Sequence, residues 1–309
     1  MINTNLPKLA LQQKVKFAHG KTELTMKITA PIKALATALP IFYLTSCNEP
    51  AENVQRASTT DTAVTSKVQF KSQSIEQASS NCSSDSTTCA VVNIHYPEAV
   101  AGPAPMQQNI NKFVQQRIRQ VMLDFNPDAD TSAQGDAARQ LADAFLKQQR
   151  QYVEEISSGS GVPTATARWE LNIDAKPLYV SDGVVSMEIF IYHYAGGAHP
   201  NYYRVLQSFG AAGEHLSLKE IVTDTVKLRK LTEEKFRQVK EGVGNKPLAE
   251  AGLFIDGDTL PFPQNAALTP EGLLLYYNPY EIGPWAFGDS EIILPYQQVN
   301  NLLAAPYRH

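Results

Sequence analysis

The chain has 309 residues, of which 43% are hydrophobic and 19% are charged, and its formal charge at pH 7 is −4. This composition is that of a globular protein and excludes wholesale disorder, collagen and a coiled coil. The length allows about two domains of roughly 150 residues each. A negatively charged chain does not offer the basic surface that non-specific binding to phosphates requires, so we expect no nucleic-acid partner.

The first feature along the chain is a segment typical of a secretion leader. Lys27 and Lys33 precede an uncharged, largely apolar run over residues 34–46, which is shorter than the ~20 residues of a membrane-spanning helix. The run ends in Leu-Thr-Ser-Cys at residues 44–47, which resembles the lipobox of bacterial lipoproteins. The resemblance implies cleavage before Cys47 and attachment of lipid, including palmitate, to the mature protein at this residue.

The N-terminal segments follow from this leader. We assign residues 26–46 to a lipoprotein signal peptide and residues 1–25 to an extension upstream of Met26, an alternative start. Residues 47–66 lack apolar periodicity and form a flexible tether to the membrane. Asn48 follows the lipidated cysteine, which fits anchoring to the outer membrane on its periplasmic face, in the cell envelope.

Cleavage would change the charge balance. Six of the 27 basic residues and one of the 31 acidic residues precede Cys47, so the remaining chain carries 21 basic and 30 acidic residues and a net charge of −9. An acidic surface attracts basic partners.

Two cysteines remain besides Cys47. Cys82 and Cys89 enclose six polar residues, and in an oxidising compartment this spacing predicts a structural disulfide. Two cysteines alone provide too few ligands for a metal, and their spacing is not that of a Cys-x-x-Cys redox motif.

The first half of the remaining chain predicts two strands followed by two helices. Alternating apolar residues predict strands over 67–71 and 90–96, the second of them ended by Pro97. Apolar residues at steps of three and four predict helices over 106–125 and 136–156. Ser157–Pro163 contains two glycines and a proline, and we take it as the boundary between an N-terminal α+β companion domain, 67–160, and a C-terminal domain, 161–309.

The second half predicts mostly strands. They are expected over residues 167–174, 178–180, 184–194, 202–209, 273–277 and 291–294, with one charged helix over 224–241. The helices come in groups and the strands pair as hairpins. The predicted fold class is therefore α+β, with two small α+β units whose helices pack on largely antiparallel sheets.

The sequence does not contain the common enzyme signatures. It has no Gly-x-Ser-x-Gly nucleophile elbow, His-Glu-x-x-His zinc motif, phosphate-binding glycine loop or dinucleotide fingerprint. We therefore expect a binding protein rather than an enzyme, without a cofactor. Two alternatives remain: a cell-wall glycan hydrolase using Glu281 with a second carboxylate, and a purely structural envelope protein.

The segment Tyr192–Pro200 is the first candidate for a functional loop. His193 and His199, with His215 downstream, could supply zinc ligands. However, His193 shares a strand face with apolar residues, which is typical of a hydrogen-bonded core histidine, so we expect no metal. Gly196 and Gly197 fit a turn with positive φ.

The segment Tyr276–Gly288 is the second candidate because it is rich in aromatic residues and proline. Such aromatics could form a platform for sugar rings or an anchor for a protein partner. The alternative is a proline-constrained loop that buries its aromatics over the sheet. Glu281 stands among apolar neighbours and is either a functional acid or a buried carboxylate that accepts hydrogen bonds.

Five strings that occur in order carry a family resemblance: Gly196–His199, Leu216–Ile221, Leu268–Leu273, Tyr277–Pro284 and Ile293–Tyr296. Together they resemble the C-terminal domain of RsiV-like, lysozyme-sensing anti-sigma factors, a domain that also occurs in envelope lipoproteins of unknown function and in PdaC-type peptidoglycan deacetylases. The preceding residues, about 68–156, are similar to the companion domain of those proteins.

The resemblance implies an extracytoplasmic binding module whose ligand is a lysozyme-like protein or peptidoglycan. A cytoplasmic sigma-binding segment, an internal transmembrane helix and a deacetylase domain are not recognisable in this sequence, so we expect binding without transmembrane signalling. The residues expected to contribute to binding are Gly197, His199, Tyr202, Tyr280, Glu281 and Trp285.

Overall fold

The computed structural model describes residues 67–80, 82–83, 87–159, 167–255 and 257–309, all of which lie within one compact unit, Thr60–His309. The predicted signal peptide, the lipidation site Cys47 and the tether lie outside the described residues. Among the residues that are described, no helix combines the length and the apolar character needed to cross a membrane.

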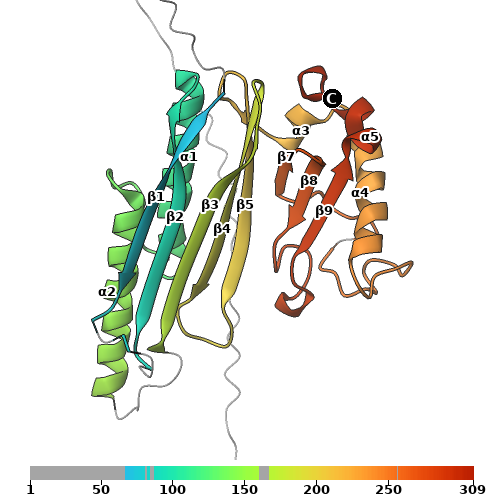
Figure 1. Cartoon of the computed structure of the whole chain (residues 1–309). Coiled ribbons are helices and arrows are strands. Elements are labelled where there is room, and N and C mark those ends of the chain that lie inside the picture. Colours follow the sequence, from blue (N-terminus) through green and yellow to red (C-terminus); the bar gives the residue numbers. More distant parts are fainter. Residues whose placement is uncertain (1–66, 81, 84–86, 160–166, 256) are drawn as a thin grey trace, which may run out of the picture. The chain divides into compact units, whose positions relative to one another are not determined.

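The described strands form two sheets (Figure 1). The larger sheet has the order β1-β2-β3-β4-β5-β6, and the smaller has the order β7-β8-β9. Every pairing is antiparallel except that of β2 with β3. The strands are β1 (Gln69–Ala78), β2 (Ala90–Ala101), β3 (Trp169–Val180), β4 (Val184–Tyr194), β5 (Asn201–Gly210), β6 (His215–Leu216), β7 (Asn265–Leu268), β8 (Gly272–Tyr277) and β9 (Ser290–Pro295).

Helices α1 (Ala104–Gln120) and α2 (Ala137–Ser158) cover one face of the larger sheet, and the 3-10 turn η1 (Val121–Asp124) extends α1. The Asp136 side chain begins α2 by accepting hydrogen bonds from two backbone N–H groups of its first turn. The alternate residues of β4 that include Met187 and Ile191 are buried with the apolar stripes of both helices in one core.

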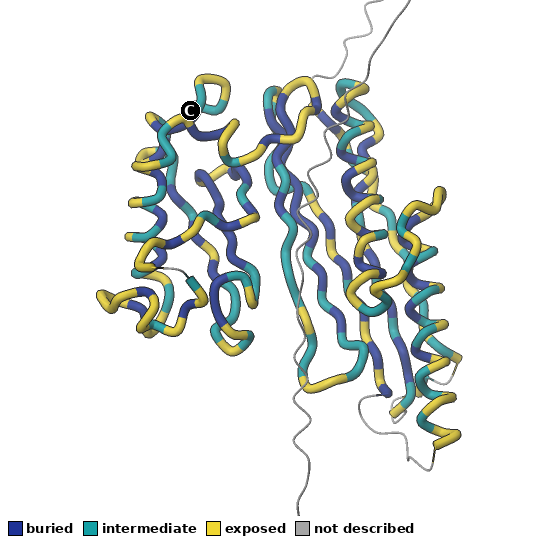
Figure 2. Tube along the Cα trace, turned by 180° about the vertical axis from the view of Figure 1, so that it is seen from behind, coloured by how far each residue is buried: buried dark blue, intermediate teal, exposed yellow. Residues whose placement is uncertain are grey.

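The smaller sheet packs against the other face of the larger one (Figures 1 and 2). Leu206 of β5 is buried with Leu274 and Tyr276 of β8 between the sheets. Helix α4 (Thr225–Val239) covers the outer face of the smaller sheet and buries Phe236 against it. The short helices α3 (Leu218–Ile221) and α5 (Tyr296–Val299) complete this part. The predicted α+β class with largely antiparallel sheets is confirmed.

Several details differ from the sequence predictions: β3 is one strand where two were expected, β7 was not expected, and β2 and the domain boundary differ as follows. Strand β2 continues through Pro97, which was expected to end it, because β3 pairs with β2 only as far as His95. Beyond that point β2 has one neighbouring strand, and a position with an unpaired side tolerates proline. The larger sheet also crosses the expected domain boundary at residues 160/161, since β2 and β3 pair in parallel across it.

Cys82 and Cys89 form the predicted disulfide, with Cα atoms 4.6 Å apart. The bond closes the connection between β1 and β2, and Cys89 is buried directly before β2 begins. A closed loop of this length restricts the unfolded chain, so the bond stabilises the fold mainly through the entropy of the unfolded state.

We expect the double variant Cys82→Ala, Cys89→Ala to lose about 2–3 kcal/mol in the free energy of unfolding, measured by urea denaturation under oxidising conditions. With a reducing agent present, the difference between the variant and the wild type should largely disappear. Equal stability of both proteins under oxidising conditions would contradict this expectation.

Candidate functional site

Two loops, far apart in the sequence, form the candidate site. The first, residues 195–200, joins β4 to β5, and the second, residues 278–289, joins β8 to β9. Gly196 and Gly197 in the first loop have φ angles of 87° and 100°, as the predicted turn requires. The Tyr194 hydroxyl donates to the carbonyl oxygen of Gly197 at 3.0 Å, which fixes this turn.

His199 of the first loop contacts two aromatic residues of the second. Its ring stacks on that of Trp285, with ring centroids 4.3 Å apart and an interplanar angle of 25°. Its Nδ1 atom lies 2.9 Å from the carbonyl oxygen of Pro200, and only a protonated nitrogen can donate there. In the neutral ring Nε2 is then an acceptor, and the Tyr280 hydroxyl donates to it at 3.2 Å. The structure thus brings the predicted residues His199, Tyr280 and Trp285 together.

Tyr280 has an unusual backbone conformation. Its φ angle is 67°, and among the described residues it is the one non-glycine residue with positive φ. Its side chain is nevertheless presented outward, since the residue is 55% exposed. Backbone strain of this kind persists where the surrounding structure enforces it, and it occurs often at binding sites.

Glu281 holds this loop in place. One carboxylate oxygen accepts from the backbone N–H of Gln264 at 2.7 Å, and the other accepts from that of Asn278 at 2.9 Å. Burial raises the pKa of Glu281, and the two hydrogen bonds oppose this effect. Both oxygens accept backbone hydrogen bonds, as the interpretation of Glu281 as a hydrogen-bonded carboxylate predicts, and the predicted contribution of Glu281 to binding stays a prediction.

Asn278 attaches the second loop to the larger sheet. Its side-chain amide accepts from the backbone N–H of Arg204 at 2.7 Å and donates to the carbonyl oxygen of Arg204 at 3.0 Å. Asn265 of β7 accepts in the same way from the backbone N–H of Leu206 at 3.0 Å. Two asparagine side chains therefore occupy the side of β5 that faces away from β4.

Tyr202 of β5 contacts the C-terminal end of the second loop. Its hydroxyl donates to Asp289 at 3.2 Å, and the Tyr276 hydroxyl donates to the same carboxylate at 2.6 Å. Burial and the charge of Asp289 raise the pKa of the Tyr202 hydroxyl. Lys240, directly after α4, donates to the carbonyl oxygens of Phe287 and Asp289, which ties the end of the loop to the end of α4.

An open cleft borders the aromatic residues. It has a volume of about 390 Å³ and is lined by Asp124, His193, Asn201, Tyr202, Tyr203, Pro279, Tyr280 and Trp285. A second cavity of about 260 Å³ lies beside it and is lined by Asp124, Phe125, Trp169, His193, Ala195, Gly196, His199 and Asn201. The two hollows share Asp124, His193 and Asn201, so we treat them as one groove and call it the Asp124 groove.

The floor of this groove contains a polar chain that sequence reasoning missed. The Tyr203 hydroxyl donates to Oδ2 of Asp124 at 2.5 Å, and Nε2 of His193 lies 3.6 Å from the same oxygen. Burial lowers the pKa of His193 and raises that of Asp124, while the charge of each opposes the effect on the other. Asp124 gave no signal in the sequence because it falls at the end of an amphipathic helix.

Of the three histidines considered as zinc ligands, His193 and His199 line the same cavity, whereas His215 does not line it. His193 is buried, as predicted for a core histidine, whereas His215 packs against Phe113 and Phe209. Within the described part of the chain, no group of three His, Cys, Asp or Glu side chains could hold a metal ion.

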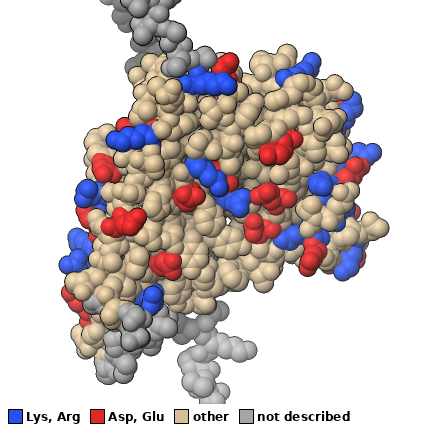
Figure 3. Space-filling model, in the orientation of Figure 1, with Lys and Arg blue, Asp and Glu red and all other residues tan. Residues whose placement is uncertain are grey.

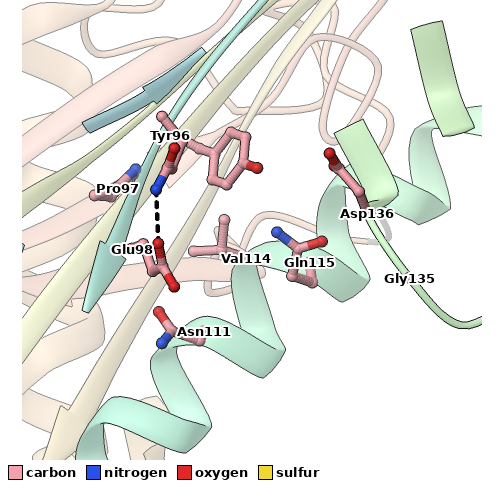
Figure 4. A pocket seen from close by; sticks show the side chains of 9 residues that line it. Tyr96, Pro97, Glu98, Asn111, Val114, Gln115, Gly135 and Asp136 are labelled. Carbon is pink, nitrogen blue, oxygen red and sulfur yellow. Dashed lines mark hydrogen bonds between the residues drawn. The ribbon is translucent and has the colours of Figure 1, made fainter. Parts of the chain in front are cut away.

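A further cavity of about 460 Å³ lies between β2 and α1 (Figure 4). Its polar side chains already serve the fold: Asn111 bonds both the N–H and the carbonyl of Ala99, and Gln115 accepts from the backbone of Ala137. Gln73 donates to Glu98 at 2.6 Å. This cavity therefore offers few polar groups without a structural role.

Two family models match separate parts of the chain. The model described as "Deacetylase PdaC" matches residues 83–202, and the model described as "Protein of unknown function (DUF3298)" matches residues 219–297. The chain thus combines PdaC-like and DUF3298-like segments. His199 lies in the PdaC-like segment and Tyr280 and Trp285 in the DUF3298-like segment, so residues from both segments form the aromatic group. None of the curated proteins compared with the chain matches it.

Two solved structures have a similar fold. A DUF3298 family member from Bacteroides fragilis aligns with a TM-score of 0.59 at 20% identity, over 77% of this chain and 94% of its own. A DUF3298 family protein from Pseudomonas aeruginosa aligns with a TM-score of 0.50 at 16% identity, over 78% of this chain and 97% of its own. At these identities the likeness concerns the fold alone.

Proposed function

We propose that this chain is a lipid-anchored, extracytoplasmic binding protein of the bacterial envelope that holds a lysozyme-like protein at the aromatic group formed by His199, Tyr280 and Trp285. The observation that carries the proposal is Tyr280. Its side chain is 55% exposed and its backbone is fixed at positive φ by a loop that is hydrogen-bonded to the sheet. A rigid, exposed aromatic residue is the kind of side chain that anchors protein partners.

An extracytoplasmic role has separate support. The PdaC-like and DUF3298-like segments are of envelope type, and the disulfide between Cys82 and Cys89 fits an oxidising compartment. The lipobox-like sequence before Cys47 supports an anchor. Catalysis by Glu281 has little support, because both of its oxygens accept backbone hydrogen bonds.

The choice of a lysozyme-like partner rests on the sequence resemblance and on charge. The chain after Cys47 would carry −9, and an acidic surface attracts a basic partner, which we expect a lysozyme-like hydrolase to be. On the face in Figure 3, acidic and basic side chains are interspersed. We therefore assign the affinity mainly to the aromatic contacts and expect charge to affect the association rate.

Titration of the full chain with a lysozyme in a calorimeter tests the proposal. We expect saturable binding that weakens as the ionic strength rises from about 0.01 M to about 1 M, because the screening length then falls from ~30 Å to ~3 Å. Lysozyme activity on cell walls should fall in the same titration if the partner's active-site face is covered.

Peptidoglycan is the second candidate ligand, favoured by the open cleft of about 390 Å³, which is lined by four tyrosine and tryptophan residues and has a size and lining suited to sugar rings. Co-sedimentation of the full chain with insoluble peptidoglycan tests it. If the chain co-sediments with peptidoglycan but gives no heat of binding with lysozyme, peptidoglycan is the ligand. If neither experiment detects binding, the remaining interpretation is a structural envelope protein.

A further inference from the structure

The Asp124 groove contains polar groups that the proposed aromatic contacts do not use. Asp124 lies at the end of η1, His193 on β4 and Tyr203 on β5, so three separate elements bring this chain of side chains together. The fold does not require a carboxylate here to cap a helix or close a turn.

The first indication is the charge of the lining. Of the described residues that line the two parts of the groove, Asp124 is the one acidic side chain, and none is Lys or Arg. The Asp124 side chain is 28% exposed, so it is partly removed from water but still reachable. His193 is the basic residue nearest to Asp124, and because burial lowers its pKa it favours the neutral form and leaves the carboxylate charge largely uncompensated. A partly desolvated carboxylate in this state favours a cationic ligand over a neutral or anionic one.

The second indication is the number of hydrogen bonds left unmade. Oδ2 of Asp124 accepts from Tyr203 and faces His193, while Oδ1 makes no hydrogen bond to a described residue. The His193 side chain is 5% exposed, and its Nδ1 atom is buried without a hydrogen-bond partner in the described part of the chain. Buried polar atoms are normally paired, so the His193 atom marks an unusual site, and the accessible Oδ1 of Asp124 is the acceptor that a ligand in the groove can use.

The third indication is the aromatic wall. Six aromatic residues besides the histidines line the groove: Phe125, Trp169, Tyr202, Tyr203, Tyr280 and Trp285. The face of an aromatic ring attracts an ammonium or guanidinium group, and the attraction grows as water is excluded. A carboxylate that accepts hydrogen bonds, combined with aromatic rings that attract positive charge, is a combination suited to binding organic cations.

We propose that the Asp124 groove is a binding site for an organic cation, an ammonium or guanidinium group whose N–H donors pair with Asp124 while its apolar side lies on the ring of Tyr280 or Trp285. The cation has two sources: a lysine or arginine side chain of a protein partner, or a small amine such as an amino sugar with a free amino group. The inference shares one element with the proposed function: the groove is lined by Tyr280 and Trp285, which belong to the proposed aromatic binding group.

Calorimetric titration of the full chain with arginine methyl ester tests the proposal, with citrulline methyl ester as the neutral isostere. We expect the arginine ester to bind with a dissociation constant of about 1 mM, which is typical of a ligand of this size, and the citrulline ester to bind at least ~10-fold more weakly. Equal affinity for the two esters, or binding of neither, would overturn the proposal. This comparison uses the wild-type chain and so does not depend on the folding of a variant.

Asp124→Asn tests the assignment to this groove, because asparagine can still accept from Tyr203 but carries no charge. Asp128→Asn changes the net charge equally at an exposed position four residues away and is the matched control. We expect Asp124→Asn to weaken binding of the arginine ester ~10-fold or more and Asp128→Asn to change it less than ~2-fold. Equal effects of the two substitutions would refute the site.

The two sources are separated by comparing methyl glucosaminide with methyl N-acetylglucosaminide. Preference for the free amine over the amide points to an amino sugar, whereas binding of the arginine ester alone points to a protein side chain. The proposed function and the cation site can be rejected independently. If the chain binds the arginine ester but neither lysozyme nor peptidoglycan, the proposed function is rejected and the cation site is retained. If it binds lysozyme or peptidoglycan but not the ester, the cation site is rejected and the proposed function is retained.

Discussion

The substitution Tyr280→Ala is expected to weaken binding of the envelope ligand ~30-fold or more, measured by calorimetry with the full chain. Aromatic residues at the centre of an interface commonly contribute ~2 kcal/mol or more, which corresponds to this factor. Tyr280 is 55% exposed, so the free energy of unfolding should change by less than ~1 kcal/mol. The combination of a large loss of affinity with a small loss of stability identifies a binding residue.

Two control variants separate the ring from the backbone. Tyr280→Gly also removes the ring but relieves the strain at φ 67°, so it should lose the same affinity while retaining or gaining stability. Tyr280→Phe keeps the ring and loses the hydroxyl that donates to His199, and should keep most of the affinity. Wild-type affinity in both the alanine and the glycine variants would show that the ligand binds elsewhere.

The substitution Glu281→Ala is expected to lower the free energy of unfolding by about 1–3 kcal/mol, measured by urea denaturation. It leaves the partly buried N–H of Asn278 without its acceptor, at a cost of ~1–3 kcal/mol, and frees the N–H of Gln264, which is exposed and can bind water at a smaller cost. Burial of the carboxylate, which raises the pKa of Glu281, offsets part of this contribution in the wild type. The variant should also bind its ligand more weakly, because the loop that presents Tyr280 loses its internal support.

Glu281→Gln is the conservative counterpart. Its side chain has one acceptor oxygen, so it can satisfy one of the two N–H groups and should lose about half as much stability as the alanine variant. Glu250→Ala removes an exposed carboxylate and should change stability by less than ~0.5 kcal/mol. If Glu281→Ala were as stable as Glu250→Ala, the Glu281 carboxylate would not stabilise the fold, and its interpretation as a functional acid would be favoured instead.

The elements with strong apolar periodicity could be predicted from the sequence. The stripe that includes Met106, Ile110 and Ile118 predicted α1, and the alternation along β4 assigned Ile189 and Ile191 to the core face. The disulfide followed from the count and spacing of the cysteines. In each case the information lies within a short stretch of chain, where helix and strand periods are directly visible.

Features that depend on contacts between distant residues could not be predicted. The parallel pairing of β2 with β3 joins strands separated by two helices, and no local pattern specifies which strands become neighbours. Asp124 and His193 lie 69 positions apart in the sequence and meet only because η1 ends beside β4. The grouping of His199 with Trp285 likewise depends on how the two sheets pack, although each residue was recognised as a candidate.

The asparagine contacts on β5 have a consequence for the solution behaviour of the protein. Strand β5 pairs with β6 only at Ser208 and Phe209, so without Asn278 and Asn265 the backbone groups of Arg204 and Leu206 would be free to pair with another molecule. Unpaired strand edges promote intermolecular strand addition and aggregation. The loop that presents Tyr280 therefore also protects this edge of β5 from strand addition, and we expect sequence changes in the loop to be constrained by the need to retain the Asn278 amide.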